Sequence, residues 1–447
     1  MALSDDELDL IAALRKKLDS TKRQDELMWR YYRLQQRIEQ LGMAIPPEMR
    51  NFMVVANWAR TLVDGIRDRQ QLRFMTLPGE EDADPDLREI AEANDLDARI
   101  ETFNMDRLIY GRAFMSVGTN EDDADLPLMR VESPRQMSAL IDTRRETMTA
   151  AGRFYRDDDA RVQHVTLLLP DTTIWCERQK GRWVEKDRDE HNLGAVPVVM
   201  HLNRRMSGEW AGESQLTDII PFVDSTARSL TNLQFAQEAH GVPGLFATGV
   251  SKGDFVDEHG KPVPQFEAYF DAIKILTDKD AKWGQFSAAD LQNFDTAMNI
   301  YGRQASVVTA FPPDYFGITT TNPAGEGAIK ATESRLIRSI EAQNRQVGMS
   351  LGWAGGLALR LRTGEWVRGN RVASHWFDPG TPTVAQRMDA VVKAKSVEIL
   401  SREGAWDELG WSEARKDRER AYFEAEEANG LIARLLRPLP DDAPSNA

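Results

Sequence analysis

The sequence predicts an α+β fold, and three observations support this. Before residue 112, apolar side chains recur at helical spacing. Residues 113–202 contain short runs rich in β-branched and aromatic residues, separated by polar breaks. The rest of the chain returns to helical periodicity, with one Gly- and Pro-rich interruption. We therefore expect helices, then a sheet region, a helix pair, a long helix and terminal helices.

Three helices are expected ahead of the sheet. The first begins near the N-terminus, the second covers residues 51–70 and the third ends at Gly111. The apolar stripe of the first contains Leu8, Ile11, Leu14 and Leu18, and that of the second contains Val54, Val55, Trp58, Leu62 and Ile66. Seven short strands are expected within residues 113–202, including the one that holds Cys176.

Helical periodicity resumes at residues 213–240 and again at 288–311, with a Gly- and Pro-rich segment between them. This order predicts two helices running out and back with a compact tip, and Pro221 is expected to bend or restart the first of them. The longest helix follows, and Asn344 is the single polar residue in its apolar stripe. The stripe consists of Leu336, Ile340, Val347, Leu351, Ala354, Ala358 and Leu361.

After the long helix, a hairpin with its turn at Gly369-Asn370 is expected, because this pair suits a two-residue turn. The chain beyond Pro379 is charged and helical, and the last residues are expected to be disordered.

Composition narrows the classes of function. The formal net charge is -15, and a protein that grips DNA through its phosphates is expected to be basic. The sequence has no run of about 18 apolar residues, so no membrane helix is expected. The N-terminus lacks the pattern of a signal peptide. Because Cys176 is the one cysteine, no intrachain disulfide can form, which suits a reducing cytoplasm.

No catalytic or cofactor-binding motif is found. The polar segment TTTNPAGEG ahead of the long helix is not a phosphate-binding Walker loop, because Ala328 and Ile329 follow Gly327. The six histidines lack the spacing of a zinc site. Three acidic clusters, at residues 79–86, 119–125 and 155–161, are interpreted as solvated loops. We therefore predict no enzyme, no metal site and no cofactor.

Four stretches, in this order, resemble the portal (head-to-tail connector) proteins of tailed double-stranded DNA bacteriophages. They are residues 51–70, the pair LIYGRAFMSVGT and VESPRQMSALID, residues 311–351, and the pair HWFDPGTPTVAQRMDAVVKAKS and EGAWDELGWSEARKDRERA. The resemblance covers most of the chain and concerns the order of parts, since there is no catalytic signature to match.

The resemblance implies a portal-like fold: a helical and β-rich wing, a two-helix stem, a small α/β clip, a long spine helix and a helical crown. The implied bounds are 1–222 for the wing, 223–245 and 288–316 for the stem helices, 246–287 for the clip, 317–327 for the tunnel loop, 328–380 for the long helix and hairpin of the wing, and 381–447 for the crown with its disordered tail.

The resemblance also implies a function and partners. Such subunits form a ring, usually a dodecamer, at one capsid vertex, around a channel for genome packaging and ejection. The implied partners are other copies of the chain, double-stranded DNA in the channel, the large terminase, a head-tail adaptor, and the major capsid and scaffold proteins, with no membrane. The implied location is the virion, after synthesis in the cytoplasm of the host bacterium, and ATP hydrolysis belongs to the terminase.

By the same resemblance, TTTNPAGEG is the tunnel loop that projects into the channel. Its weakly charged side chains can touch DNA without a lasting grip, and its glycines permit rearrangement. Lys330 and Arg335 are the candidate channel-facing charges. The tunnel-loop residues are Thr319, Thr320, Thr321, Asn322, Gly325 and Gly327.

Two other functions remain open from the residues alone. A scaffold or adaptor protein with helical arms, which forms no ring, would also fit the pattern of helices around a sheet. A metal-dependent enzyme would use the acidic clusters, and its activity would depend on Asp82 or Asp157.

Overall fold

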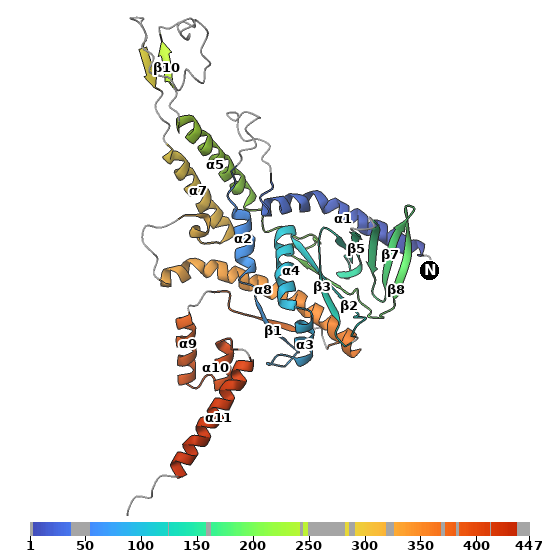
Figure 1. The fold of residues 1–447 in the computed structure, drawn as a ribbon. Coiled ribbons are helices and arrows are strands. Elements are labelled where there is room, and N and C mark those ends of the chain that lie inside the picture. Colours follow the sequence, from blue (N-terminus) through green and yellow to red (C-terminus); the bar gives the residue numbers. More distant parts are fainter. Residues whose placement is uncertain are drawn as a thin grey trace, which may run out of the picture. The chain divides into compact units, whose positions relative to one another are not determined.

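The fold is that of a computed structural model (Figure 1). It describes residues 3–36, 54–123, 125–157, 162–241, 245–248, 282–285, 291–318, 326–367, 372–380, 384–411 and 413–435. The chain divides into a larger unit, Met1–Pro379, and a smaller unit, Gly380–Ala447. Helices and antiparallel sheets both contribute to the larger unit, as the predicted α+β class requires.

Four helices precede or flank the first strands: α1 (Asp5–Tyr32), α2 (Trp58–Arg67), α3 (Pro85–Ala93) and α4 (Leu96–Tyr110). Ser4 and Glu7 form a capping box at the start of α1. The second helix was predicted from residue 51, but residues 54–57 are not helical. The helix begins instead after Asn57, whose side chain accepts a hydrogen bond from the Arg60 amide.

The strands form antiparallel sheets. The order is β3-β2-β9 in a three-stranded sheet and β4-β5-β6-β7-β8 in a five-stranded one. All seven predicted strands are present, whereas β4 was missed. The bounds are β2 Arg112–Gly118, β3 Leu128–Glu132, β4 Met137–Asp142, β5 Thr147–Arg156, β6 Gln163–Leu168, β7 Thr173–Gln179, β8 Arg182–Asp189 and β9 Val198–Leu202.

The predicted out-and-back helices are α5 (Ile220–Gly241) and α7 (Gln292–Thr309), which pack against each other (Figure 1). Pro221 lies in the first turn of α5, where its missing amide hydrogen is tolerated. Of the two expected effects, it therefore marks the start of a helix and does not bend one. Between them, β10 (Leu245–Thr248) pairs antiparallel with β11 (Lys282–Gln285).

The long helix is α8 (Glu326–Thr363), and its apolar stripe joins two hydrophobic cores. Leu336 and Ile340 pack in the first core with α2, α4 and α7. Val347, Leu351 and Ala354 pack in the second core with α3, α4 and the three-stranded sheet. This helix therefore runs through two of the hydrophobic cores of the larger unit.

The predicted hairpin after α8 is wrong. Strand β12 (Ala373–Trp376) pairs antiparallel with β1 (Leu72–Thr76), roughly 300 residues earlier in the chain. The expected turn at Gly369-Asn370 lies outside the described residues. Strand β12 also packs against α8, and Gly352 of α8 lets its backbone approach closely that of Val372, just before the strand.

The smaller unit contains α9 (Val384–Ser396), α10 (Arg402–Glu408) and α11 (Glu413–Leu435). Trp406 is buried, and its ring stacks on Trp411 and on Phe423 of α11. The tail that the sequence predicts to be disordered, residues 437–447, lies outside the described residues. No described helix is long and apolar enough to cross a membrane.

Candidate functional site

The candidate site is the segment between α7 and α8, and the structure describes its two flanks. Of the predicted tunnel-loop residues, Thr319, Thr320, Thr321, Asn322 and Gly325 lie outside the described residues. Gly327 was expected in the loop, but it belongs to the first turn of α8, which begins at Glu326.

The flank before the segment is an aromatic cluster built on the 3₁₀ helix η3 (Pro313–Phe316). The Phe311 ring meets the Tyr315 ring edge-to-face at 5.2 Å, and the Phe316 ring meets Trp58 of α2 in the same way at 5.4 Å. Gly65 of α2 leaves room for the Phe311 ring, since a Cβ there would lie 2.7 Å from it. This close packing fixes the chain just before the segment.

The flank after the segment is tied to its neighbours by charged side chains. The Arg335 guanidinium donates a hydrogen bond of 2.9 Å to the Val307 carbonyl in the last turn of α7, where a cation is favoured by the helix dipole. Arg335 is one of the two predicted channel-facing charges, and its side chain is exposed even though it is bonded to α7. Lys330 lies in α8, and its side chain is outside the described ones.

Arg69, just beyond the end of α2, contacts both flanks. It donates to the Tyr315 hydroxyl at 2.9 Å and to the Glu333 carboxylate at 2.8 Å. The sequence analysis missed this residue, because its partners lie about 250 positions away.

A buried polar layer, which we call the Arg107 layer, lies where α8 passes between the two cores. The Arg107 side chain on α4 has no exposed surface, and its acceptors are four side-chain amides. They are Asn104 at 2.8 Å, Gln343 at 3.0 Å, Asn203 at 3.2 Å, and Gln70. Gln70 in turn donates to Asn344 at 2.7 Å. Asn344, the interruption in the apolar stripe, therefore belongs to this layer.

The electrostatics of the Arg107 layer follow from burial. Desolvation lowers the pKa of Arg107 to about 9, which leaves the guanidinium charged at neutral pH. Burial, together with that charge, lowers the pKa of nearby His201 to about 3. The neutral ring of His201 lies 3.0 Å from the Ser350 hydroxyl of α8. The layer thus positions the middle of α8 through hydrogen bonds and a single buried charge.

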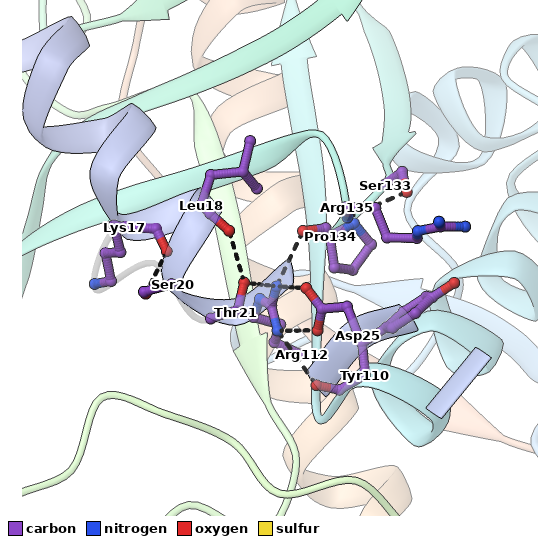
Figure 2. Close-up of polar contacts among 10 residues, drawn as sticks. All are labelled: Lys17, Leu18, Ser20, Thr21, Asp25, Tyr110, Arg112, Ser133, Pro134 and Arg135. Carbon is purple, nitrogen blue, oxygen red and sulfur yellow. Dashed lines mark hydrogen bonds and ion pairs between the residues drawn. The ribbon is translucent and has the colours of Figure 1, made fainter. Parts of the chain in front are cut away.

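Arg112, in the YGRAF stretch, joins α1 to the sheet (Figure 2). Its guanidinium donates to both oxygens of the Asp25 carboxylate, at 2.9 and 2.7 Å, and to the hydroxyl of Thr21. A further bond of 3.0 Å reaches the Pro134 carbonyl between β3 and β4. Burial raises the pKa of neighbouring Asp106 to about 7, and the charge of Arg112 opposes this shift. We interpret this cluster as an anchor for α1.

Cys176 and the acidic clusters, the reactive groups weighed in the sequence analysis, have the following surroundings in the described residues. Cys176 is buried in β7, as expected of a structural thiol, and burial raises its pKa to about 11. Within the described ranges, no group of three histidines, cysteines or carboxylates could hold a metal ion. Asp84, in one of the acidic clusters, caps the N-terminus of α3. A cleft of about 520 Å³ between the sheets is lined by mixed charges, and two of these, Glu132 and Arg153, pair with each other.

Comparison with known proteins identifies the family. A family model described as phage portal protein, SPP1 Gp6-like, matches residues 12–430. The portal protein of Mycobacterium phage D29 is 33% identical over 413 residues, covering 90% of this chain and 85% of that protein. The portal protein of Mycobacterium phage L5 is 32% identical over the same length and coverage.

Among solved structures, a chain from the neck of an empty GTA particle aligns with 82% of this chain and 94% of its own length. Its TM-score of 0.48 and sequence identity of 13% are too low to support an argument. The family rests on the sequence matches, which extend over nearly the whole chain. The protein therefore belongs to the phage portal protein family.

Proposed function

We propose that this chain is the ring-forming subunit of a portal vertex, with a central channel through which the genome is packaged and ejected. The observation that carries this proposal is the family match from residue 12 to residue 430, which includes all of the described elements except the start of α1 and the end of α11. A ring, with a dodecamer as the expected form, would place the channel between copies of the chain.

The described elements suggest roles for the segments. Helices α5 and α7 are the stem, and the region between them, with β10 and β11, is the clip that docks the large terminase and then a head-tail adaptor. The sheets, α1 to α4 and α8 form the wing. The smaller unit, with α9 to α11, is the crown, and the major capsid and scaffold proteins are further partners in this proposal.

The segment 319–325 is the tunnel loop in this proposal. Threonine and asparagine side chains can exchange weak hydrogen bonds with phosphates, whereas a cluster of lysines would retain a moving duplex. The net charge of -15 supports the same interpretation, because an acidic chain has little general affinity for DNA. Lys330 and Arg335, close to the start of α8, are the cations placed nearest to this loop in the sequence.

The chain acts in this account without catalysis of its own. The energy for packaging comes from ATP hydrolysis by the separate terminase, and no cofactor is required. The subunit works at the portal vertex of the virion, after synthesis in the cytoplasm of the host bacterium.

Deleting Thr320 to Gly325 in the phage gene is expected to abolish DNA packaging while rings and capsids still assemble. The loop contacts DNA in our proposal, whereas the flanks on η3 and α8 keep their own packing. The measurement is the DNA content of purified particles, with rings counted in negative-stain images of the same sample. A matched control replaces Thr319, Thr320 and Thr321 by serine, which keeps the hydroxyls and is expected to package normally.

Two outcomes would contradict the assignment of the loop. Particles with full genomes after the deletion would show that the segment does not serve DNA passage. Loss of rings together with DNA would show that the segment is a structural joint between subunits.

A further inference from the structure

We propose that Arg69 is the positioning residue of the tunnel loop: a single guanidinium that fastens both flanks of segment 319–325 to helix α2. This inference rests on the proposed function for its consequence in DNA passage, although the contact itself does not. We call Arg69, Tyr315 and Glu333 the Arg69 clasp.

The clasp joins three parts of the chain that are distant in sequence. Nη1 of Arg69 donates to the Tyr315 hydroxyl at 2.9 Å, and Nη2 donates to Oε1 of Glu333 at 2.8 Å. Tyr315 lies four residues before Thr319, and Glu333 lies eight residues after Gly325. One side chain thus holds the last turn before the segment and the second turn of α8 after it.

The chemistry of the contact requires arginine. A planar guanidinium presents two NH₂ groups in fixed, divergent directions, so it can bridge a hydroxyl and a carboxylate at once. A lysine ammonium has one nitrogen on a flexible stem and would have to serve both partners from a single point. The guanidinium also lies 5.8 Å from the centre of the Tyr315 ring, which adds a cation–π attraction.

The clasp is shielded from solvent. The side chains of Arg69 and Glu333 are only 15% and 12% exposed. Ion pairs in such an environment are screened less than surface pairs, and removing one partner leaves a charge poorly solvated. The contact is therefore expected to hold its geometry at physiological salt.

The end of α2 holds Arg69 in a fixed place, so Arg69 can set the position of both flanks. The Arg69 amide donates to the Ile66 carbonyl at the end of α2, and Leu62 and Ile66 are buried in the first core. Tyr315 is held by its edge-to-face contact with Phe311. Glu333 is one turn ahead of Leu336, which is buried in the same core. Both flanks therefore take their place from α2.

The test is hydrogen exchange on assembled full-length protein, comparing Arg69→Gln with the unchanged chain. Glutamine cannot bridge both partners, so the first turns of α8 lose their link to α2. We expect the exchange of amides 328–335 to accelerate at least about tenfold, through local opening, while that of amides 347–359 stays unchanged. A merely structural role would raise exchange across both regions, because it would act through global unfolding.

Substitutions that remove only one partner of Arg69 keep the proposal testable if Arg69→Gln fails to fold. Tyr315→Phe removes one hydroxyl and Glu333→Gln removes one charge, so each is expected to accelerate exchange of amides 328–335 less than Arg69→Gln. Arg69→Lys is expected to give an intermediate result. The matched control is Arg88→Gln, which removes an exposed arginine paired with Glu92 on α3 and is expected to change neither region.

Unchanged exchange of amides 328–335 in Arg69→Gln, or acceleration equal in both regions, would overturn the clasp. In phage, Arg69→Gln is further expected to lower the yield of DNA-filled particles at least about tenfold while rings form normally. The two proposals fail separately: if the loop deletion leaves packaging intact, the tunnel-loop assignment fails while the exchange result still stands. If exchange is unaffected, the clasp fails while the portal function stands.

Discussion

Replacing Arg107 by alanine is expected to lower the free energy of unfolding of the larger unit by about 3–5 kcal/mol. The side chain is fully buried, and its removal leaves a cavity between the two cores on α8. It also leaves the carbonyl oxygens of its four amide partners without a donor. Buried acceptors that lose their partner each destabilise by about 1–3 kcal/mol, and relaxation or water entry recovers part of the sum.

Urea unfolding followed by tryptophan fluorescence measures this loss as a fall in the transition midpoint. The control is Arg88→Ala, because Arg88 is exposed and pairs with Glu92 one turn away. Such a pair is worth a few tenths of a kcal/mol, so the midpoint of the control is expected to stay where it was. A midpoint for Arg107→Ala within error of the control would mean that the buried layer does not hold the cores together.

Replacing Gly212 by alanine is expected to destabilise the larger unit by about 3 kcal/mol or more. A Cβ at this position would lie 1.8 Å from the Gly111 carbonyl oxygen, which is far inside contact distance. The same oxygen accepts a hydrogen bond from the Asn203 amide, so it cannot move away freely. Backbone atoms must shift at the junction of α4 and β2, and the free energy of unfolding falls accordingly.

Thermal unfolding of Gly212→Ala is best compared with Gly356→Ala. Gly356 lies inside α8, and a Cβ there would meet no heavy atom within 4 Å beyond its chain neighbours and the adjacent backbone of the helix. Alanine favours a helix over glycine by about 1 kcal/mol, so this control is expected to unfold at the same or a higher temperature. Equal unfolding temperatures for the two variants would show that the close approach of Gly111 and Gly212 is not a constraint.

Much of the fold could be predicted because local patterns and tertiary packing agree. The stripe from Leu336 to Ala358 is apolar in sequence and buried in the structure. The third predicted helix, which is α4 in the structure, ends just before Gly111, whose φ of 78° is readily adopted by glycine. Strand β4 was missed because it directly follows a Ser-Pro turn and has no clear alternation of apolar and polar residues. Its pairing with β5 stabilises the extended conformation.

The hairpin prediction failed for a different reason. The Gly-Asn pair satisfied a local rule, but β12 finds its partner in β1, because β12 packs against α8 and Met75 of β1 is buried in the core that α8 also enters. A sequence shows which residues can form a chain turn. It does not show which strand, distant in sequence, is free to pair with a given strand.

The candidate site was predictable only in part. The tunnel loop stays a prediction, made from its place before the long helix and from the family resemblance, because Thr319 to Gly325 lie outside the described residues. Arg69 and Arg107 were not identified, since their partners lie far away in sequence. Arg107 did give a signal: it lies one helical turn after Phe103, on the buried side of α4. A charged residue in that place indicates either a polar layer or a site.

The central claim is that the chain closes into a ring around a channel, and the mass and shape of the purified protein test it most directly. Light scattering gives the mass, and negative-stain images of the same peak give the shape. The account predicts a large oligomer, with rings that enclose a central hole and show twelvefold symmetry. A stable monomer or dimer, with no ring even after addition of the capsid and scaffold proteins, would contradict it and favour a scaffold or adaptor protein.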